Sequence, residues 1–182
     1  MKDSIYKMNP FEYFQKLKAE MVKDEAFMDS LRTYAFTDRL RLIGNDKVTP
    51  LGAGRHNIHF RIGKVGDVWL ATREYLEAIE LADHLHHGEN YIDAVVRAYE
   101  EGKRVPIICG GVRAENGYGG RYFLLLEDLT QGGTADFQPA PKSGGISGIL
   151  NGEEVFHDFD TDTPFHPQTK YLAEEKLLVL DK

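Results

Sequence analysis

Apolar residues recur at helical spacing through residues 9–36. Phe14, Leu17 and Met21 follow at intervals of three and four residues, which places them on one face of a helix. The same spacing over 25–36 predicts that a second helix follows the first. The chain is therefore expected to begin with an amphipathic helical segment.

The pattern changes to a period of two within residues 46–73. Polar and apolar side chains alternate from Ile58 to Ile62, and a second β-rich run follows a turn that contains Gly63 and Gly66. Alternation on both sides of a glycine-containing turn is typical of a β-hairpin.

Helical spacing returns over residues 74–101. A break at His87-Gly88 predicts that two helices share this stretch. Apolar runs at 105–112 and 121–129 then predict two strands separated by a turn.

Residues 130–148 are rich in Gly, Pro and Ser, so a flexible loop is expected there. A last hairpin is predicted over 146–160, and the tail at 170–181 adds a short helix or strand. This order predicts an α+β fold, with a mostly antiparallel sheet packed with helices. We divide it into an N-terminal helical segment, 1–45, and an α+β domain, 46–182.

Composition narrows the classes of function. The chain has 182 residues, 42% of them hydrophobic, and a net charge of -7, which argues against a broad nucleic-acid surface. Cys109 is the only cysteine, so no internal disulfide can form and a reducing, cytoplasmic setting is expected. The N-terminus has no apolar signal region, and no apolar run is long enough for a membrane span.

A glycine-containing turn precedes the first predicted hairpin. Gly52 and Gly54 stand beside Arg55, His56 and Asn57. Glycine lets the backbone approach a phosphate closely, and Arg and His side chains can donate hydrogen bonds to an anion. The alternative is an ordinary entry into a strand that needs a positive φ.

Acidic residues gather near the end of the last predicted hairpin. On a strand, Asp158, Asp160 and Asp162 would share one side, with His157 on the other. Three carboxylates repel one another unless a cation neutralises them, which favours Mg²⁺ or Ca²⁺. The alternative is an exposed acidic turn.

Histidines cluster at 84, 86 and 87. At helical spacing His84 and His87 share a face, which suits a transition metal only if a third ligand joins them. A solvated helix end is the simpler interpretation, because His86 and its neighbours also suit a helix C-terminus. Cys109, in an apolar run, is interpreted as a buried structural thiol.

Four segments, taken in order, resemble the kinase-like fold of the aminoglycoside and choline phosphotransferase type. They are similar to that family's nucleotide loop, third strand, fourth and fifth strands with the hinge, and magnesium hairpin. In this chain the segments are 54–62, 70–73, 105–108 with 122–129, and 148–160.

This resemblance implies that the chain binds ATP, or another phosphate-bearing small molecule, together with Mg²⁺. Ala71 would lie over the adenine, Arg73 would reach the phosphates, and Glu127 and Leu129 would line the adenine edge. A helix glutamate would orient Arg73, and Glu89 is favoured for that role over Glu77 and Glu80. The resulting nucleotide-binding set is Gly52, Gly54, Arg55, His56, Asn57, Ala71, Arg73, Glu89, Glu127 and Leu129, and the metal-binding set is Asp158 and Asp160.

The chain departs from the family pattern in three ways. Arg73 stands where the family has a lysine, and a guanidinium does not replace an ammonium group in a tight phosphate cradle. Residues 130–147 contain no His-Gly-Asp catalytic loop, and the stretch after Asp158 is too short for the helical large lobe. The resemblance therefore implies a degenerate or minimal kinase-like protein, with little or no phosphotransfer by itself.

Two alternatives remain at this point. The first is a non-enzymatic interaction or regulatory module that binds a protein partner through the N-terminal helices or the 130–148 loop. The second is a metal-dependent hydrolase. Its candidate ligands would be His157, Asp158, Asp160, Asp162 and His166.

Overall fold

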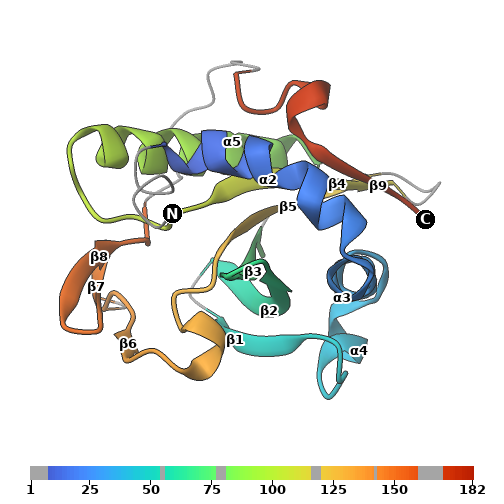
Figure 1. Cartoon of the computed structure of the whole chain (residues 1–182), viewed down its shortest axis with the longest axis horizontal. Coiled ribbons are helices and arrows are strands. Elements are labelled where there is room, and N and C mark those ends of the chain that lie inside the picture. The colour runs from blue at the N-terminus through green and yellow to red at the C-terminus, as the bar shows by residue number, and fades with distance from the viewer. Residues whose placement is uncertain (1–7, 54–55, 77–80, 116–119, 142, 160–169) are drawn as a thin grey trace.

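The structure is a computed structural model of the 182-residue chain. It describes residues 8–53, 56–76, 81–115, 120–141, 143–159 and 170–182. In this part of the chain the fold is α+β, with a mostly antiparallel six-stranded sheet, a second sheet of three strands and an N-terminal helical segment (Figure 1). The predicted fold class is confirmed.

The helices and strands have the following bounds. The helices are α2 (Pro10–Lys23), α3 (Glu25–Phe36), α4 (Arg39–Leu42) and α5 (Leu81–Glu100), with 3₁₀ helices η1 (Gln131–Gly133) and η2 (Glu174–Lys176). The strands are β1 (Thr49–Ala53), β2 (Asn57–Val65), β3 (Val68–Tyr75), β4 (Cys109–Glu115), β5 (Gly120–Glu127), β6 (Phe137–Gln138), β7 (Ser147–Leu150), β8 (Glu153–Phe156) and β9 (Leu178–Asp181).

Capping residues explain why the N-terminal segment forms two helices. The Asn9 side chain accepts hydrogen bonds from the amides of Phe11 (3.0 Å) and Glu12 (2.9 Å) at the start of α2. Asp24 ends α2 in an extended conformation, and its side chain accepts from the Phe27 amide at 3.0 Å. One residue therefore ends the first helix and caps the second, and the two helices that the spacing predicted are both present.

The six strands of the large sheet lie in the order β1-β2-β3-β5-β4-β9. All neighbouring pairs are antiparallel except β4 and β9, which are parallel. Helix α5 lies between β3 and β4 in sequence and packs mainly on β5. Residues of α5 and of the end of β3 line a common crevice.

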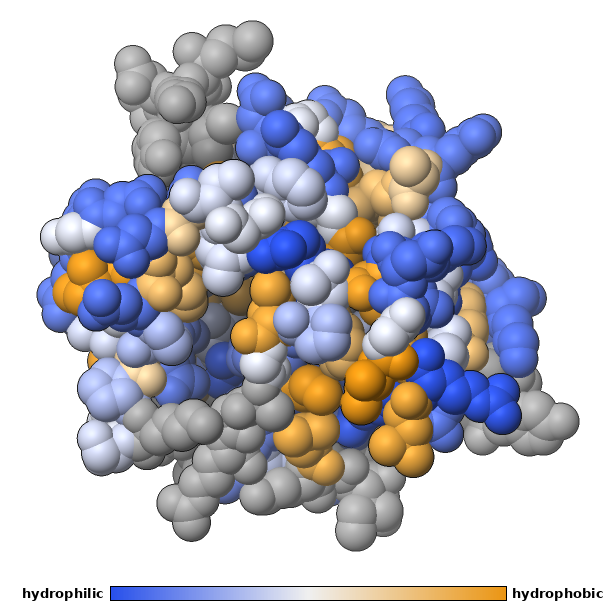
Figure 2. Space-filling view, turned by 90° about the horizontal axis from the view of Figure 1, so that it is seen from below, coloured by the Kyte–Doolittle hydropathy of each residue, from blue (hydrophilic) through white to orange (hydrophobic). Residues whose placement is uncertain are grey.

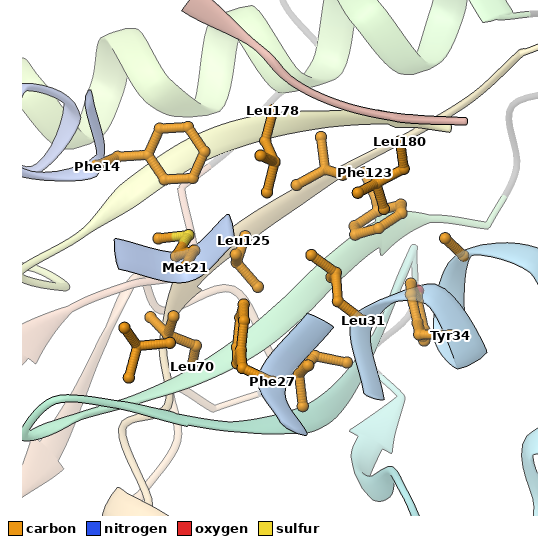
Figure 3. Packing of buried hydrophobic residues seen from close by; sticks show 14 of the residues in the cluster. Phe14, Met21, Phe27, Leu31, Tyr34, Leu70, Phe123, Leu125, Leu178 and Leu180 are labelled. Atoms are coloured by element: carbon orange, nitrogen blue, oxygen red, sulfur yellow. The ribbon is translucent and has the colours of Figure 1, made fainter. Parts of the chain in front are cut away.

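The two faces of the sheet carry separate cores. Alternation along β5 sends Phe123 and Leu125 toward α2 and α3, and sends Leu124 and Leu126 toward α5. Figure 3 shows the first core, in which helix residues such as Phe14 lie opposite strand residues of the sheet. The alternation of side chains along the strands therefore determines which of them face α5, where the candidate site lies.

A buried ionic network links α3 to the sheet. The Glu74 carboxylate, whose side chain is 1% exposed, accepts two hydrogen bonds from Arg121, at 2.9 and 2.7 Å. The same carboxylate accepts from the Tyr34 hydroxyl at 2.5 Å and lies 2.8 Å from Arg39. Arg121 also donates to the carbonyls of Tyr34 (2.8 Å) and Ala35 (3.1 Å), which lie in the last turn of α3. One guanidinium thus neutralises a buried charge and satisfies a helix end.

In the small sheet, β6-β7-β8, the side chains of Leu150 and Val155 pack against Leu129. The Phe156 amide donates to the Arg104 carbonyl at 2.8 Å, which ties the end of β8 to the segment before β4. The predicted hairpin at 146–160 is therefore present as β7 and β8.

The lower side of the molecule carries some apolar surface. Leu40, in α4, is 81% exposed and Ile43 is 70% exposed. Figure 2, seen from this side, shows apolar side chains set among polar ones. Isolated exposed apolar residues of this kind are ordinary on protein surfaces.

Two predicted features of the secondary structure are wrong. Helix α5 runs without interruption through His87 and Gly88, so the predicted break is absent. Gly88 is there because the Tyr122 ring packs against it: a Cβ at this position would lie 2.3 Å from a ring carbon. Residues 105–108 are not a strand, since the Ile107 amide donates to the Glu127 side chain at 2.9 Å instead of to a neighbouring strand.

Two further predictions about the last third of the chain are corrected. The 130–148 segment is not a continuous flexible loop, because η1, β6 and the start of β7 lie within it. Strand β8 ends at Phe156, so Asp158 follows the strand and the argument for three carboxylates on one strand face fails.

Candidate functional site

Strand β3 directs Arg73 toward α5. Leu70 belongs to the core on the other face, and Glu74 contacts Tyr34 of α3 there, so the alternate residue Arg73 points the opposite way. Its guanidinium carbon lies 4.3 Å from the centre of the Tyr91 ring of α5. This places the cation between the sheet and the helix.

Arg73 is almost fully buried but weakly paired. Its side chain is 5% exposed, and its Nη2 lies 3.5 Å from Oδ1 of Asp158, whose side chain is 47% exposed. No other hydrogen bond of the Arg73 side chain to a described residue is formed. A guanidinium offers five N–H donors, so one long contact and one aromatic ring leave it short of acceptors.

Two histidines lie near this pair. Nδ1 of His59 is 3.1 Å from the Thr72 carbonyl, which fits a ring protonated at Nδ1. Burial and the positive charge of Arg73 lower the pKa of His59 to about 3. Nε2 of His157 accepts from the Ala140 amide at 3.0 Å, and burial, more than Arg73, lowers the pKa of His157, while Asp158 opposes that shift. Both rings are therefore neutral at pH 7.

A pocket opens beside Arg73, between β3 and α5. It is a small crevice, whose cavity volume is about 20 Å³. The Tyr75 ring stacks on the His87 ring with 3.7 Å between their centres, which forms part of its wall. The residues around the pocket are Asn57, Arg73, Tyr75, His84, His87, Gly88, Tyr91, Tyr122, Phe123 and Leu124.

Part of the predicted nucleotide loop reaches this pocket. Asn57 lines it, and His56 stacks on Tyr75 with 6.3 Å between ring centres. Gly52 lies in β1 with a φ of 143°, in open space. Gly54 and Arg55 lie outside the described residues. The structure thus brings His56 and Asn57 near Arg73.

Glu89 does not pair with Arg73, so that prediction is wrong. Its carboxylate is buried, with the residue 5% exposed, and lies near the backbone of Lys170; neither oxygen makes a hydrogen bond of normal geometry to a described residue. Burial raises the pKa of Glu89. The face of α5 that meets β3 carries His84, Gly88 and Tyr91, and Glu89 lies beside that face.

The residues predicted to hold adenine are buried within the chain itself. Ala71 is 4% exposed, and Leu129, 6% exposed, packs in the core of the small sheet. The Glu127 carboxylate accepts from Arg104 at 2.9 and 3.2 Å and from the Ile107 amide at 2.9 Å. These three residues therefore have structural roles and are not brought to the Arg73 pocket.

Asp128 organises the segment after β5 and was missed by the sequence analysis. Its buried carboxylate accepts from Arg61 Nε at 2.7 Å, from the Thr130 amide at 2.9 Å and from the Gly132 amide at 3.1 Å. An Asp whose side chain bonds amides two to four residues ahead is a known turn device, so the Asp-Leu-Thr-Gln-Gly run carried the signal. The tyrosines of the pocket were also missed, although His84, His87 and Tyr91 recur at helical spacing.

The structure describes only some of the residues that were predicted to bind a metal. Asp158 lies beside Arg73, whereas Asp160, Asp162 and His166 lie outside the described residues. Within the described ranges, no three His, Cys, Asp or Glu side chains converge as a metal site, the His84–His87 cluster included. Across the same ranges, no helix has the length and apolar character needed to cross a membrane.

Comparison of the chain with protein-family models, with curated proteins and with solved structures gives no match.

The neutral state of His59 predicts a pH-dependent stability. The folded pKa, about 3, lies below the unfolded value of about 6.5, so the unfolded chain takes up the proton first as pH falls. Stability from this residue is complete above pH 6.5 and is lost progressively toward pH 3. Between pH 7 and pH 5 we expect wild type to lose about 2 kcal/mol more than His59→Gln in urea unfolding. Parallel losses in the two proteins would contradict a His59 that stays neutral in the folded protein.

Proposed function

We propose that this protein binds the phosphate groups of a nucleotide such as ATP, together with Mg²⁺, through Arg73 and Asp158. One observation carries the proposal. Arg73 and Asp158, 85 residues apart in sequence, face each other at 3.5 Å, and Arg73 also lines a small crevice between β3 and α5. In the phosphotransferase family that the sequence resembles, a cation from the third strand and an Asp after the last hairpin serve the phosphates and the metal.

The state of Arg73 supports an anionic ligand. A buried charge is costly unless it is paired and hydrogen-bonded, and the Asp158 contact is long and half exposed. Phosphate oxygens match the planar donors of a guanidinium and form short charge-assisted hydrogen bonds. A phosphate beside Arg73 would therefore supply acceptors that the described residues do not.

The position of Asp158 fits a metal ion that is bound jointly by the protein and by the phosphates of the ligand. Mg²⁺ is usually bound in proteins by one or two carboxylates, several waters and the phosphates of a substrate. A single half-exposed carboxylate next to the phosphate-binding cation meets that requirement, and no cage of protein ligands is needed.

Binding with little turnover is the form of the activity that fits the site. The histidines near Arg73 are held neutral, and a pKa of about 3 makes His59 a weak proton acceptor at neutral pH. We therefore assign these histidines a structural role around Arg73, and neither is a strong base at neutral pH.

We also place the protein in a reducing, cytoplasmic compartment. Cys109 is fully buried, and burial raises the pKa of its thiol to about 12. An unreactive lone thiol inside the core fits a structural role in such a compartment. A protein partner remains a second candidate, to be considered if no nucleotide binds.

Isothermal titration calorimetry with ATP, with and without Mg²⁺, tests the proposal. We expect Mg²⁺ to tighten ATP binding to wild type about tenfold or more, and Asp158→Asn to lose that dependence because one carboxylate charge is removed. Asp93→Asn is the matched control, since Asp93 pairs with Arg97 within α5 and accepts a hydrogen bond from Tyr171, and not from Arg73. An unchanged Mg²⁺ dependence in Asp158→Asn would remove Asp158 from the site.

A further inference from the structure

We infer that the crevice beside Arg73 binds a single monatomic anion of the size of chloride. This site goes beyond the proposed function, because it requires neither a nucleotide nor Mg²⁺. It follows from the pairing of Arg73, from the volume of the crevice and from the other residues that line it.

Arg73 carries a buried charge that the described residues compensate poorly. Its side chain is 5% exposed, and its ion pair is a 3.5 Å contact with an Asp158 carboxylate that is 47% exposed. The Tyr91 ring packs against the guanidinium but brings no full negative charge. A water molecule would accept hydrogen bonds from Arg73 without neutralising it, whereas an anion does both.

The volume of the crevice matches one small ion. It is about 20 Å³, and a cavity needs roughly 10–15 Å³ to hold one water molecule. A chloride ion is only slightly larger than water, whereas phosphate and organic anions have several heavy atoms and do not fit. Asp158 is not among the residues that line the crevice. The phosphates of the proposed function would therefore lie outside it, on the Asp158 side of the guanidinium.

Asn57 supplies a second donor to the same space. It pairs with Tyr75, two residues after Arg73, so Asn57 and Arg73 project from neighbouring strands on one face of the sheet. The Asn57 side chain makes no hydrogen bond to another described residue, so its amide is free to donate. His84 and His87 also line the crevice but have other contacts. Among the described residues around the crevice there is no carboxylate to repel an anion.

Thermal melting of the full chain, without nucleotide, tests the anion site. The protein is melted in sodium chloride, sodium bromide and sodium gluconate at one ionic strength of about 0.15 M, so that screening is equal. We expect a melting temperature about 3 °C higher in the two halides than in gluconate, because the folded chain binds the small ion and the unfolded chain does not. Equal melting temperatures in the three salts would overturn the site and leave the proposed function untouched.

Three variants distinguish this site from a general effect of the salt. Arg73→Met removes the guanidinium and should melt at the same temperature in chloride and gluconate. Asn57→Asp brings a carboxylate to the crevice that repels the anion, so it should lose the difference as well. Asn45→Asp is the matched control and should keep it, because Asn45 lies before β1 and an Asp there retains the oxygen that accepts from the Lys47 amide at 2.8 Å. A halide effect that persists in Arg73→Met or in Asn57→Asp would show that the ion binds elsewhere.

Discussion

Arg121→Met is expected to destabilise the protein by about 3–5 kcal/mol, because it leaves the Glu74 carboxylate buried without its main partner. Glu74 has a side chain that is 1% exposed, and it keeps only Tyr34 and the partly exposed Arg39 in the variant. The carbonyls of Tyr34 and Ala35 also lose the donor that satisfies the end of α3. Chemical unfolding monitored by circular dichroism measures the loss.

A matched control and a double variant separate charge from packing. Arg97→Met removes a guanidinium that is 74% exposed and paired with Asp93 within α5, so a change below about 0.5 kcal/mol is expected. Combining Arg121→Met with Glu74→Gln should cost less than the sum of the single changes, because the orphaned charge is gone. Strict additivity, or an Arg121→Met effect no larger than that of Arg97→Met, would contradict the network.

Arg73→Met is expected to abolish measurable binding of MgATP while leaving the unliganded protein as stable as wild type, or more so. The cation is 5% exposed and has one ion-pair contact, at 3.5 Å, so its removal relieves a poorly compensated buried charge. Met fills similar space against the Tyr91 ring. The same removal takes away the guanidinium that we propose for the phosphates.

Calorimetry and thermal melting on one protein preparation separate these effects. Loss of at least thirtyfold in affinity, with no fall in the melting temperature of the unliganded protein, is the expected pair of results. Arg97→Met again serves as control and should bind as wild type does. Retained affinity would show that Arg73 has no phosphate role, and a large fall in stability would show that its contact with Asp158 is structural.

The sequence predicted the features of the fold that depend on local residues. The helices at 10–23 and 25–36 were predicted from apolar spacing, and the structure adds Asn9 and Asp24 as the residues that cap them. The hairpins β2–β3 and β7–β8 follow from alternation on both sides of glycine turns. Such signals lie within a few residues of the structure that they specify.

Features that depend on tertiary packing were not predictable in this way. Gly88 indicates a helix break locally, yet in the fold it makes room for Tyr122. Glu89 has the right charge for Arg73 but lies beside the face of α5 that meets β3. The packing angle between helix and sheet determines which residues face β3, and local sequence does not indicate that angle. At the end of β8, the Phe156 amide donates to the Arg104 carbonyl, a contact between residues 52 positions apart that no local pattern indicates.

The candidate site was predicted in part for the same reason. Arg73 and Asp158 were both named from sequence, and the fold places them together. The burial of Ala71 and the ion pair between Glu127 and Arg104 depend on tertiary packing, which no local sequence pattern indicates. The sequence thus identified the charged groups, and the structure was needed to show which of them contact one another.

The most direct test of the account is the melting temperature of the full chain with ATP, measured with and without Mg²⁺. At a ligand concentration one hundred times the dissociation constant, binding adds about 2.7 kcal/mol of stability, which corresponds to a rise of about 5–10 °C for a chain of this size. We predict that rise with Mg²⁺ and a clearly smaller one without it. An unchanged melting temperature in both conditions would contradict the proposal that Arg73 and Asp158 form a nucleotide-phosphate site.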